Sequence, residues 1–182
     1  MLKALTLSGS VRADSSNSRL AKAIGQKLRE KGVDVTNIDL LNFPLELFNE
    51  DSEAANGEPD AAVELAKMFA QAHIIFIASP EYNGSVSPLL KNTIDWISRQ
   101  KTGPYKNATF GIGAASPGKM GGVGGLGHLR EILNKLGALV VPLTLGVGNS
   151  FNAFAPNGDF REDMVGRRAD NMVKQLLNIR RS

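Results

Sequence analysis

The chain contains no cysteine and only two histidines in 182 residues. The absence of thiols excludes disulfide bridges, thiolate metal sites, cysteine-ligated iron–sulfur clusters and cysteine nucleophiles. His73 and His128 are too few for a histidine-rich metal centre, and the sequence shows no serine–histidine–aspartate arrangement. We therefore expect neither a metal site nor a catalytic side-chain nucleophile.

Long hydrophobic runs are also missing. No segment approaches the roughly 20 apolar residues that cross a membrane as a helix. After Lys3 the first apolar run covers only Ala4–Leu7, whereas the apolar region of a secretory signal needs about 7–15 residues. The composition, 42% hydrophobic and 21% charged, is that of a soluble globular protein. We expect one cytoplasmic domain over residues 1–182, without membrane contact.

Neither sign of charge dominates, because the formal net charge is only +3. Basic residues gather in the final predicted helix and beyond it, where such a cluster is usually a solvated face or part of a subunit contact. Nucleic-acid binding would need a basic stripe with interleaved aromatic or groove-reading residues. The sequence has no such stripe, so no nucleic-acid partner is expected. The basic residues are Arg161, Arg167, Arg168, Lys174, Arg180 and Arg181.

Strand-like and helix-like segments alternate along the whole chain, apart from a polar loop at 42–58. Five such repeats predict an α/β fold of three layers, a five-stranded parallel sheet with helices on both faces. Ligands of such sheets lie beyond the carboxyl ends of the strands, near the reversal of strand order. We expect the site in the loops after the first, third and fourth strands. Strands are predicted at 2–8, 33–40, 73–79, 108–115 and 139–145, and helices at 17–31, 59–72, 88–99, 129–136 and 160–179.

The segment 8–20, between the first strand and the first helix, is rich in hydroxyl groups. Helix N-termini present unpaired N–H groups and a partial positive charge, which suit an anion. Neutral and charge-assisted hydrogen bonds could come from Ser10, Ser15, Ser16, Asn17 and Arg12. The segment predicts a phosphate site, although one of these residues could simply cap the helix. The glycine spacings of the common mononucleotide and dinucleotide loops are absent.

Two further loops have unusual composition. In 79–88 two prolines flank Asn83-Gly84, a turn whose bare backbone could approach a flat ligand, with Tyr82 along its edge or face. An ordinary strand-to-helix turn with a packed tyrosine explains the same residues. In 116–125 five of the ten residues are glycine, which indicates close approach to a ligand, a mobile cover, or flexibility alone.

Three motifs in these segments resemble the NADPH-dependent FMN reductase family. They are Gly-Ser-Val-Arg-x-x-Ser-Ser-Asn-x-x-Leu at 9–20, Ser-Pro-Glu-Tyr-Asn-Gly-Ser at 79–85 and Leu-Lys-Asn-Thr-Ile-Asp-Trp at 90–96. That family has a short flavodoxin-like fold and includes quinone, azo-dye and chromate reductases. The similarity spans nearly the whole chain in the same order.

The resemblance implies an FMN site built from all three loops. The phosphate would be bound by Ser10, Arg12, Ser15 or Ser16, and Asn17. The ribityl chain and ring would be bound by Pro80, Glu81, Tyr82, Asn83, Gly84 and Ser85, with the loop at 116–122, including Ser116, Gly118 and Gly121, at the other edge. Many members carry an arginine where this chain has Gly124, so any contact made by that arginine is missing here.

The resemblance also implies an activity. NADPH or NADH would pass hydride to bound FMN, and two electrons would then pass to a quinone, a flavin or a similar small acceptor by ping-pong turnover. Members are usually homodimers or homotetramers, and Trp96 is a candidate contact between copies if it is not a core residue. The alternatives are a flavodoxin-type electron carrier without nicotinamide reactivity and a module that has lost its flavin. The pI near 9.3 argues against the carrier, because such carriers are commonly acidic.

Overall fold

A computed structural model describes residues 1–179 of the chain. Its main sheet has five parallel strands in the order β2-β1-β3-β6-β7, which confirms the predicted α/β architecture. The strands are β1 (Lys3–Ser8), β2 (Asp34–Ile38), β3 (Ile74–Ala78), β6 (Thr109–Ala115) and β7 (Leu139–Val147). The predicted basic residues Arg180 and Arg181 lie outside the described residues.

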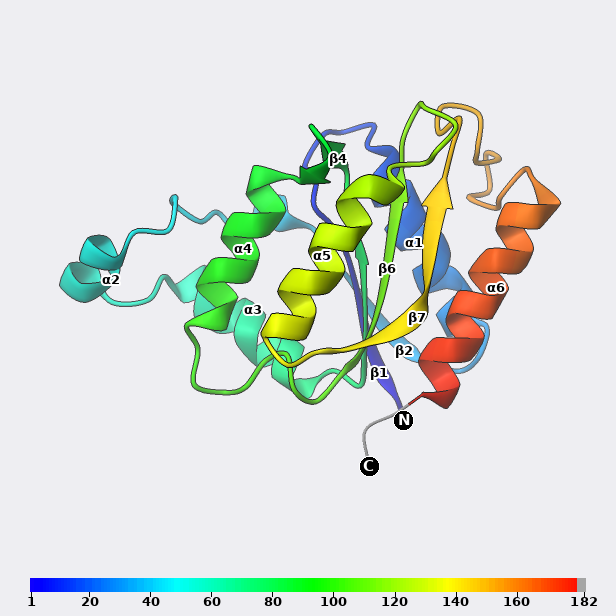
Figure 1. The fold of residues 1–182 in the computed structure, drawn as a ribbon. Coiled ribbons are helices and arrows are strands. Elements are labelled where there is room, and N and C mark those ends of the chain that lie inside the picture. Colours follow the sequence, from blue (N-terminus) through cyan, green and yellow to red (C-terminus); the bar gives the residue numbers. More distant parts are fainter. Residues whose placement is uncertain (180–182) are drawn as a thin grey trace.

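Helices cover both faces of this sheet, as predicted (Figure 1). On one face lie α3 (Asp60–Gln71), α4 (Pro88–Ser98) and α5 (Val123–Lys135). The other face is covered by α1 (Ser16–Arg29) and α6 (Asp163–Asn178). No helix within residues 1–179 is long and apolar enough to cross a membrane.

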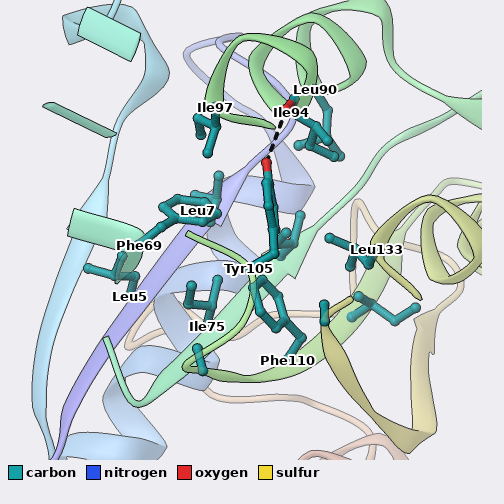
Figure 2. Packing of buried hydrophobic residues seen from close by; sticks show 14 of the residues in the cluster. Leu5, Leu7, Phe69, Ile75, Leu90, Ile94, Ile97, Tyr105, Phe110 and Leu133 are labelled. Carbon is teal, nitrogen blue, oxygen red and sulfur yellow. Dashed lines mark hydrogen bonds between the residues drawn. The ribbon is translucent and has the colours of Figure 1, made fainter. Parts of the chain in front are cut away.

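Strands β3 and β6, in the interior of the sheet, explain why strands could be predicted from apolar runs in the sequence. Every residue of β3 and β6 is buried, as expected for parallel strands with both faces covered. Figure 2 shows the cluster on the α3–α5 face, where the hydroxyl of Tyr105 donates to the carbonyl oxygen of Ile94 at 3.1 Å. Burial raises the pKa of Tyr105 well above its usual value. Trp96 is also fully buried in its own chain, so it is a core residue and not an exposed contact.

One predicted loop is partly wrong, because the segment 42–58 contains the short helix α2 (Glu50–Asn56). The side chain of Asn49 caps it by accepting from the N–H groups of Asp51 and Ser52 at 2.8 and 3.3 Å. No residue of α2 is buried, so the helix has no apolar periodicity to read. In Figure 1 it projects from the body of the molecule as an arm.

The loop after β3 forms a small hairpin of β4 (Glu81–Tyr82) and β5 (Ser85–Val86). Asn83 and Gly84 have φ values of 51° and 77°, the geometry of a two-residue turn between antiparallel strands. The predicted Asn83-Gly84 turn is therefore confirmed. The two strands were not predicted, because two residues are too few for a periodic pattern.

Two other boundaries differ from the prediction. Helix α5 begins at Val123, so Gly124 and Gly125 are helical rather than part of the glycine-rich loop. Strand β7 continues to Val147, because Ala114 and Ala115 of β6 pair with its last two residues. Both shifts bring additional residues to the carboxyl edge of the sheet.

Candidate functional site

The direction in which successive strands are added to the sheet reverses between β1 and β3, and we call this place the switch point. From β1 the chain moves outward to β2 and then returns to pair β3 on the other side of β1. Crevices at such points are where parallel α/β sheets bind ligands. A cavity of about 250 Å³ and a second of about 120 Å³ open at this edge, and the smaller one contains most of the predicted site residues.

We call the smaller one the switch-point cavity. It brings together three loops that are far apart in the sequence. Among the predicted residues it contains Ser10, Arg12, Ser15, Ser16, Asn17, Pro80, Glu81, Tyr82 and Ser116. It also contains Pro117 of the predicted loop at 116–122, and Ala115, Ser150 and Phe151, which were not predicted.

The start of α1 provides donors for an anion. Ser15 is the N-cap, and its Oγ accepts from the N–H of Ser18 at 3.2 Å, while its hydroxyl hydrogen is left for another partner. Within residues 1–179 the N–H groups of Ser16 and Asn17 have no acceptor, as is usual in a first helical turn. Two N–H groups and the positive end of the helix dipole therefore favour a negative group here.

Asn17 also has a structural role that was not predicted for its side chain. Its Nδ2 donates to the carbonyl of Ala115 and its Oδ1 accepts from the N–H of Ala115, both at 2.9 Å and both buried. The amide group is therefore used within the protein, where it ties the start of α1 to the end of β6. The backbone N–H of Asn17 and the second N–H of its Nδ2 remain for a ligand.

Ser150 is a site residue that the sequence reasoning missed. It is 1% exposed, and its Oγ has no hydrogen-bond partner among the described residues. It follows β7, whose loop was not among the three singled out. The signal was the polar Gly148-Asn149-Ser150 directly after an apolar strand. A buried hydroxyl without a partner is costly unless a ligand or water satisfies it.

Glu81 connects two walls of the site. Its Oε2 accepts from the N–H of Gly125 at 2.8 Å. The N-cap of α5 is Gly122, which has no side chain to cap the helix, so the carboxylate of Glu81 does this from the hairpin. A Cβ on Gly124 would lie 3.0 Å from the same oxygen. An arginine at that position would therefore begin beside a carboxylate.

Five predicted residues do not line the switch-point cavity: Asn83, Gly84, Ser85, Gly118 and Gly121. The Oγ of Ser85 instead lies 2.9 Å from Nδ1 of His128 on α5. Gly121 is required for packing, since it has a φ of 64° and a Cβ there would lie 2.6 Å from the backbone nitrogen of Val147. These five residues form the outer turns of the same two loops, and their contact with a ligand stays a prediction.

The donor set fits a phosphate-bearing planar ligand such as FMN. The guanidinium of Arg12 has no ion pair within residues 1–179, and it lies in the same cavity as the two free N–H groups and the unsatisfied Ser150 hydroxyl. Pro80, Tyr82 and Phe151 add apolar surface, with Phe151 72% exposed at the rim. A cavity lined by both charge-assisted donors and apolar side chains suits a phosphorylated ring compound.

Comparison with known proteins agrees with this geometry. The family model described as NADPH-dependent FMN reductase matches residues 2–152. The chain is 34% identical to an NAD(P)H-dependent FMN reductase of Pseudomonas aeruginosa, over 97% of this chain and 89% of that protein. It is 33% identical to an NADPH:quinone oxidoreductase of Arabidopsis thaliana, over 97% and 87%.

A solved structure shows the same fold. It is a flavoenzyme NAD(P)H:(acceptor) oxidoreductase from Paracoccus denitrificans, with a TM-score of 0.76, 24% identity, and coverage of 97% of this chain and 98% of that one. The family model, the sequence relatives and the fold comparison agree with one another. The chain belongs to the NADPH-dependent FMN reductase family.

Proposed function

We propose that the protein is an FMN-dependent NAD(P)H oxidoreductase that passes two electrons to a quinone, a flavin or a similar small acceptor by ping-pong turnover. The observation that carries the proposal is the switch-point cavity, which is lined by residues whose N–H groups, guanidinium (Arg12) and hydroxyl (Ser150) have no partner within residues 1–179. The names of the relatives support it, because they are reductases of FMN and of quinones. Bound FMN supplies the hydride chemistry.

In this proposal the residues of the chain bind and orient the cofactor. Arg12, the N–H groups of Ser16 and Asn17, and nearby hydroxyls hold the phosphate at the start of α1. Pro80, Glu81, Tyr82 and Ser116 lie around the remaining part of the cofactor, and the other predicted residues, Asn83, Gly84, Ser85, Gly118 and Gly121, shape the turns that carry them. No side-chain acid or base is required.

The deciding experiment is an absorbance spectrum of the protein after FMN addition and desalting, followed by anaerobic NADPH or NADH. Flavin bands that remain after desalting and bleach with either nucleotide support the proposed enzyme. Bands that remain but do not bleach indicate a carrier instead. A protein that retains no flavin overturns the proposal.

Ser150 gives a prediction that separates ligand binding from folding. Ser150→Ala should weaken FMN binding by about two- to tenfold, the effect of one neutral hydrogen bond. The same change should not lower the stability of the apoprotein, because the Oγ has no partner to lose in the described part of the chain. Equilibrium titration of FMN and urea unfolding measure the two effects. Unchanged FMN affinity would remove Ser150 from the site.

We further propose a cytoplasmic homodimer or homotetramer in which the α2 arm contacts another copy. Leu47, in the base of the arm at 46–48, is 82% exposed. The ion pair of Glu53 on α2 with Arg99, the C-cap of α4, at 2.9 Å holds the arm to the body. Helix α2 has no buried residue in its own chain, so it gains burial when it packs against a second copy. Leu47→Glu should therefore lower the sedimenting mass, and a wild-type monomer at micromolar concentration would contradict the proposal.

A further inference from the structure

The sequence contains Asn-Gly at three places, 56–57, 83–84 and 157–158. Asparagine is a thermolabile residue, and a following glycine has no side chain to shield its backbone nitrogen. That nitrogen can attack the side-chain carbonyl carbon of the asparagine. The new C–N bond closes a cyclic imide, ammonia leaves, and water then opens the ring to a carboxylate. All three pairs are exposed, so exposure alone does not distinguish them.

Hydrogen bonds hold the attacking nitrogen at two of the three places. The N–H of Gly57 donates to the carbonyl oxygen of Glu53 at 2.8 Å. The N–H of Gly158 donates to the carbonyl oxygen of Ala155 at 3.0 Å. Each of these nitrogens must give up its hydrogen bond before it can turn toward the asparagine side chain, which raises the barrier to the reaction.

Neither reacting group is held at 83–84, the tip of the hairpin at the carboxyl edge of the sheet (Figure 1). Within residues 1–179 the N–H of Gly84 has no acceptor and the side-chain amide of Asn83 has no partner. By contrast, the side chain of Asn157 donates to Oδ2 of Asp159 at 2.6 Å and accepts from its N–H at 3.2 Å. A Cβ on Gly84 would find nothing within 4 Å beyond its chain neighbours, so the turn has room to rotate.

We propose that Asn83 is a modification site, at which the nitrogen of Gly84 closes on Cγ of Asn83 and hydrolysis leaves aspartate or isoaspartate. The overall reaction consumes water, releases ammonia and needs no oxidant or reductant. Asn56 and Asn157 keep their amides longer in the folded protein. The modification does not rest on the proposed function, because only the chain and water react.

The two products affect the hairpin differently. Aspartate keeps the turn, because Asp-Gly suits the same two-residue loop as Asn-Gly. Isoaspartate carries the main chain through its side-chain carbon and lengthens the loop, so the turn no longer matches the pairing of Tyr82 with Ser85. Tyr82 lines the switch-point cavity. FMN binding therefore weakens as isoaspartate accumulates, and this consequence, unlike the modification, rests on the proposed function.

The test is peptide mapping by mass spectrometry of the full chain, folded and without added FMN, during incubation in a mildly alkaline buffer. Chromatography separates the aspartate and isoaspartate peptides. Asn83 should be lost at least about threefold faster than Asn56 or Asn157, the effect of one neutral hydrogen bond. In concentrated urea the three rates should become similar, because the folded contacts that protect the other two are then gone.

The matched variant is Asn83→Gly. Glycine accepts the positive φ of this turn position and carries no amide, so the hairpin is kept and the reaction is lost. In FMN titrations before and after the incubation, the affinity of this variant should stay constant. The fraction of wild-type protein that binds FMN with its initial affinity should fall as isoaspartate forms at position 83. The melting temperature of the variant shows whether it is folded as well as the wild type.

Two results would overturn the inference. One is a loss at Asn56 or Asn157 in the folded chain that is as fast as the loss at Asn83. The other is an Asn83 that keeps its amide in the folded chain while the chain in urea loses it. Isoaspartate at position 83 with unchanged FMN affinity would confirm the modification and contradict its effect on the cofactor. A protein that binds no FMN fails the proposed function, and the peptide map still decides the modification.

Discussion

Asn17→Ala is expected to lower the free energy of unfolding by about 2–5 kcal/mol, because two buried backbone groups lose their partners. The amide of Asn17 satisfies both the N–H and the carbonyl of Ala115, and no other side chain in the described residues is bonded to either group. Urea unfolding monitored by circular dichroism measures the change. FMN affinity should fall as well, since the start of α1 is no longer tied to the end of β6.

Two further variants sharpen this test. Asn17→Asp can still accept from the N–H of Ala115 but cannot donate to its carbonyl, so its stability should lie between those of the wild type and the alanine variant. Asn134→Ala, at an exposed position of α5, should change stability by no more than about 0.5 kcal/mol. If Asn17→Ala proves as harmless as Asn134→Ala, the structural role given to this amide is wrong.

Arg12→Ala should weaken FMN binding by about ten- to 150-fold, which corresponds to the loss of a charge-assisted contact worth about 1.5–3 kcal/mol. The guanidinium is exposed and has no ion pair within residues 1–179, so the stability of the apoprotein should change little. Fluorescence titration of FMN at two or more salt concentrations measures the affinity. The difference between variant and wild type should shrink as salt screens the phosphate contact.

The control for Arg12→Ala is Arg167→Ala, which removes the same charge from an exposed position on α6. It should leave FMN affinity within about twofold of the wild type, because Arg167 does not line the switch-point cavity. Arg12→Lys should restore part of the affinity, since lysine keeps the charge but loses the planar fork. Equal FMN affinity in Arg12→Ala and the wild type would contradict a phosphate at this loop.

The fold was predictable from the sequence where buried elements require runs or periodic spacings of apolar residues. Strands β3 and β6 are buried along their whole length, so they read as continuous apolar runs. Helix α2 buries nothing and therefore carries no such pattern. Its only signals were local, namely Asn49 as a cap and the acidic residues Glu50 and Asp51 in its first turn.

The site was predictable in composition but not in its internal hydrogen bonds. Hydroxyl groups and an arginine at the start of a helix predict an anion-binding site from local sequence alone. The true partner of the Asn17 side chain is Ala115, 98 residues away, and the cap of α5 comes from Glu81, 44 residues before the glycine it binds. Such pairings exist only once the chain has folded, and no local pattern reveals them.

The environment of Trp96 has a practical consequence. The chain has a single tryptophan, whose indole N–H donates to the carbonyl of Glu46 at 2.8 Å and whose ring meets Phe48 edge-on at 5.0 Å. Both partners belong to the base of the α2 arm. Detachment of the arm would therefore expose the indole to water and shift its fluorescence emission to longer wavelength. Intrinsic fluorescence therefore offers an optical reporter of arm docking that can be recorded separately from the visible colour of a bound flavin.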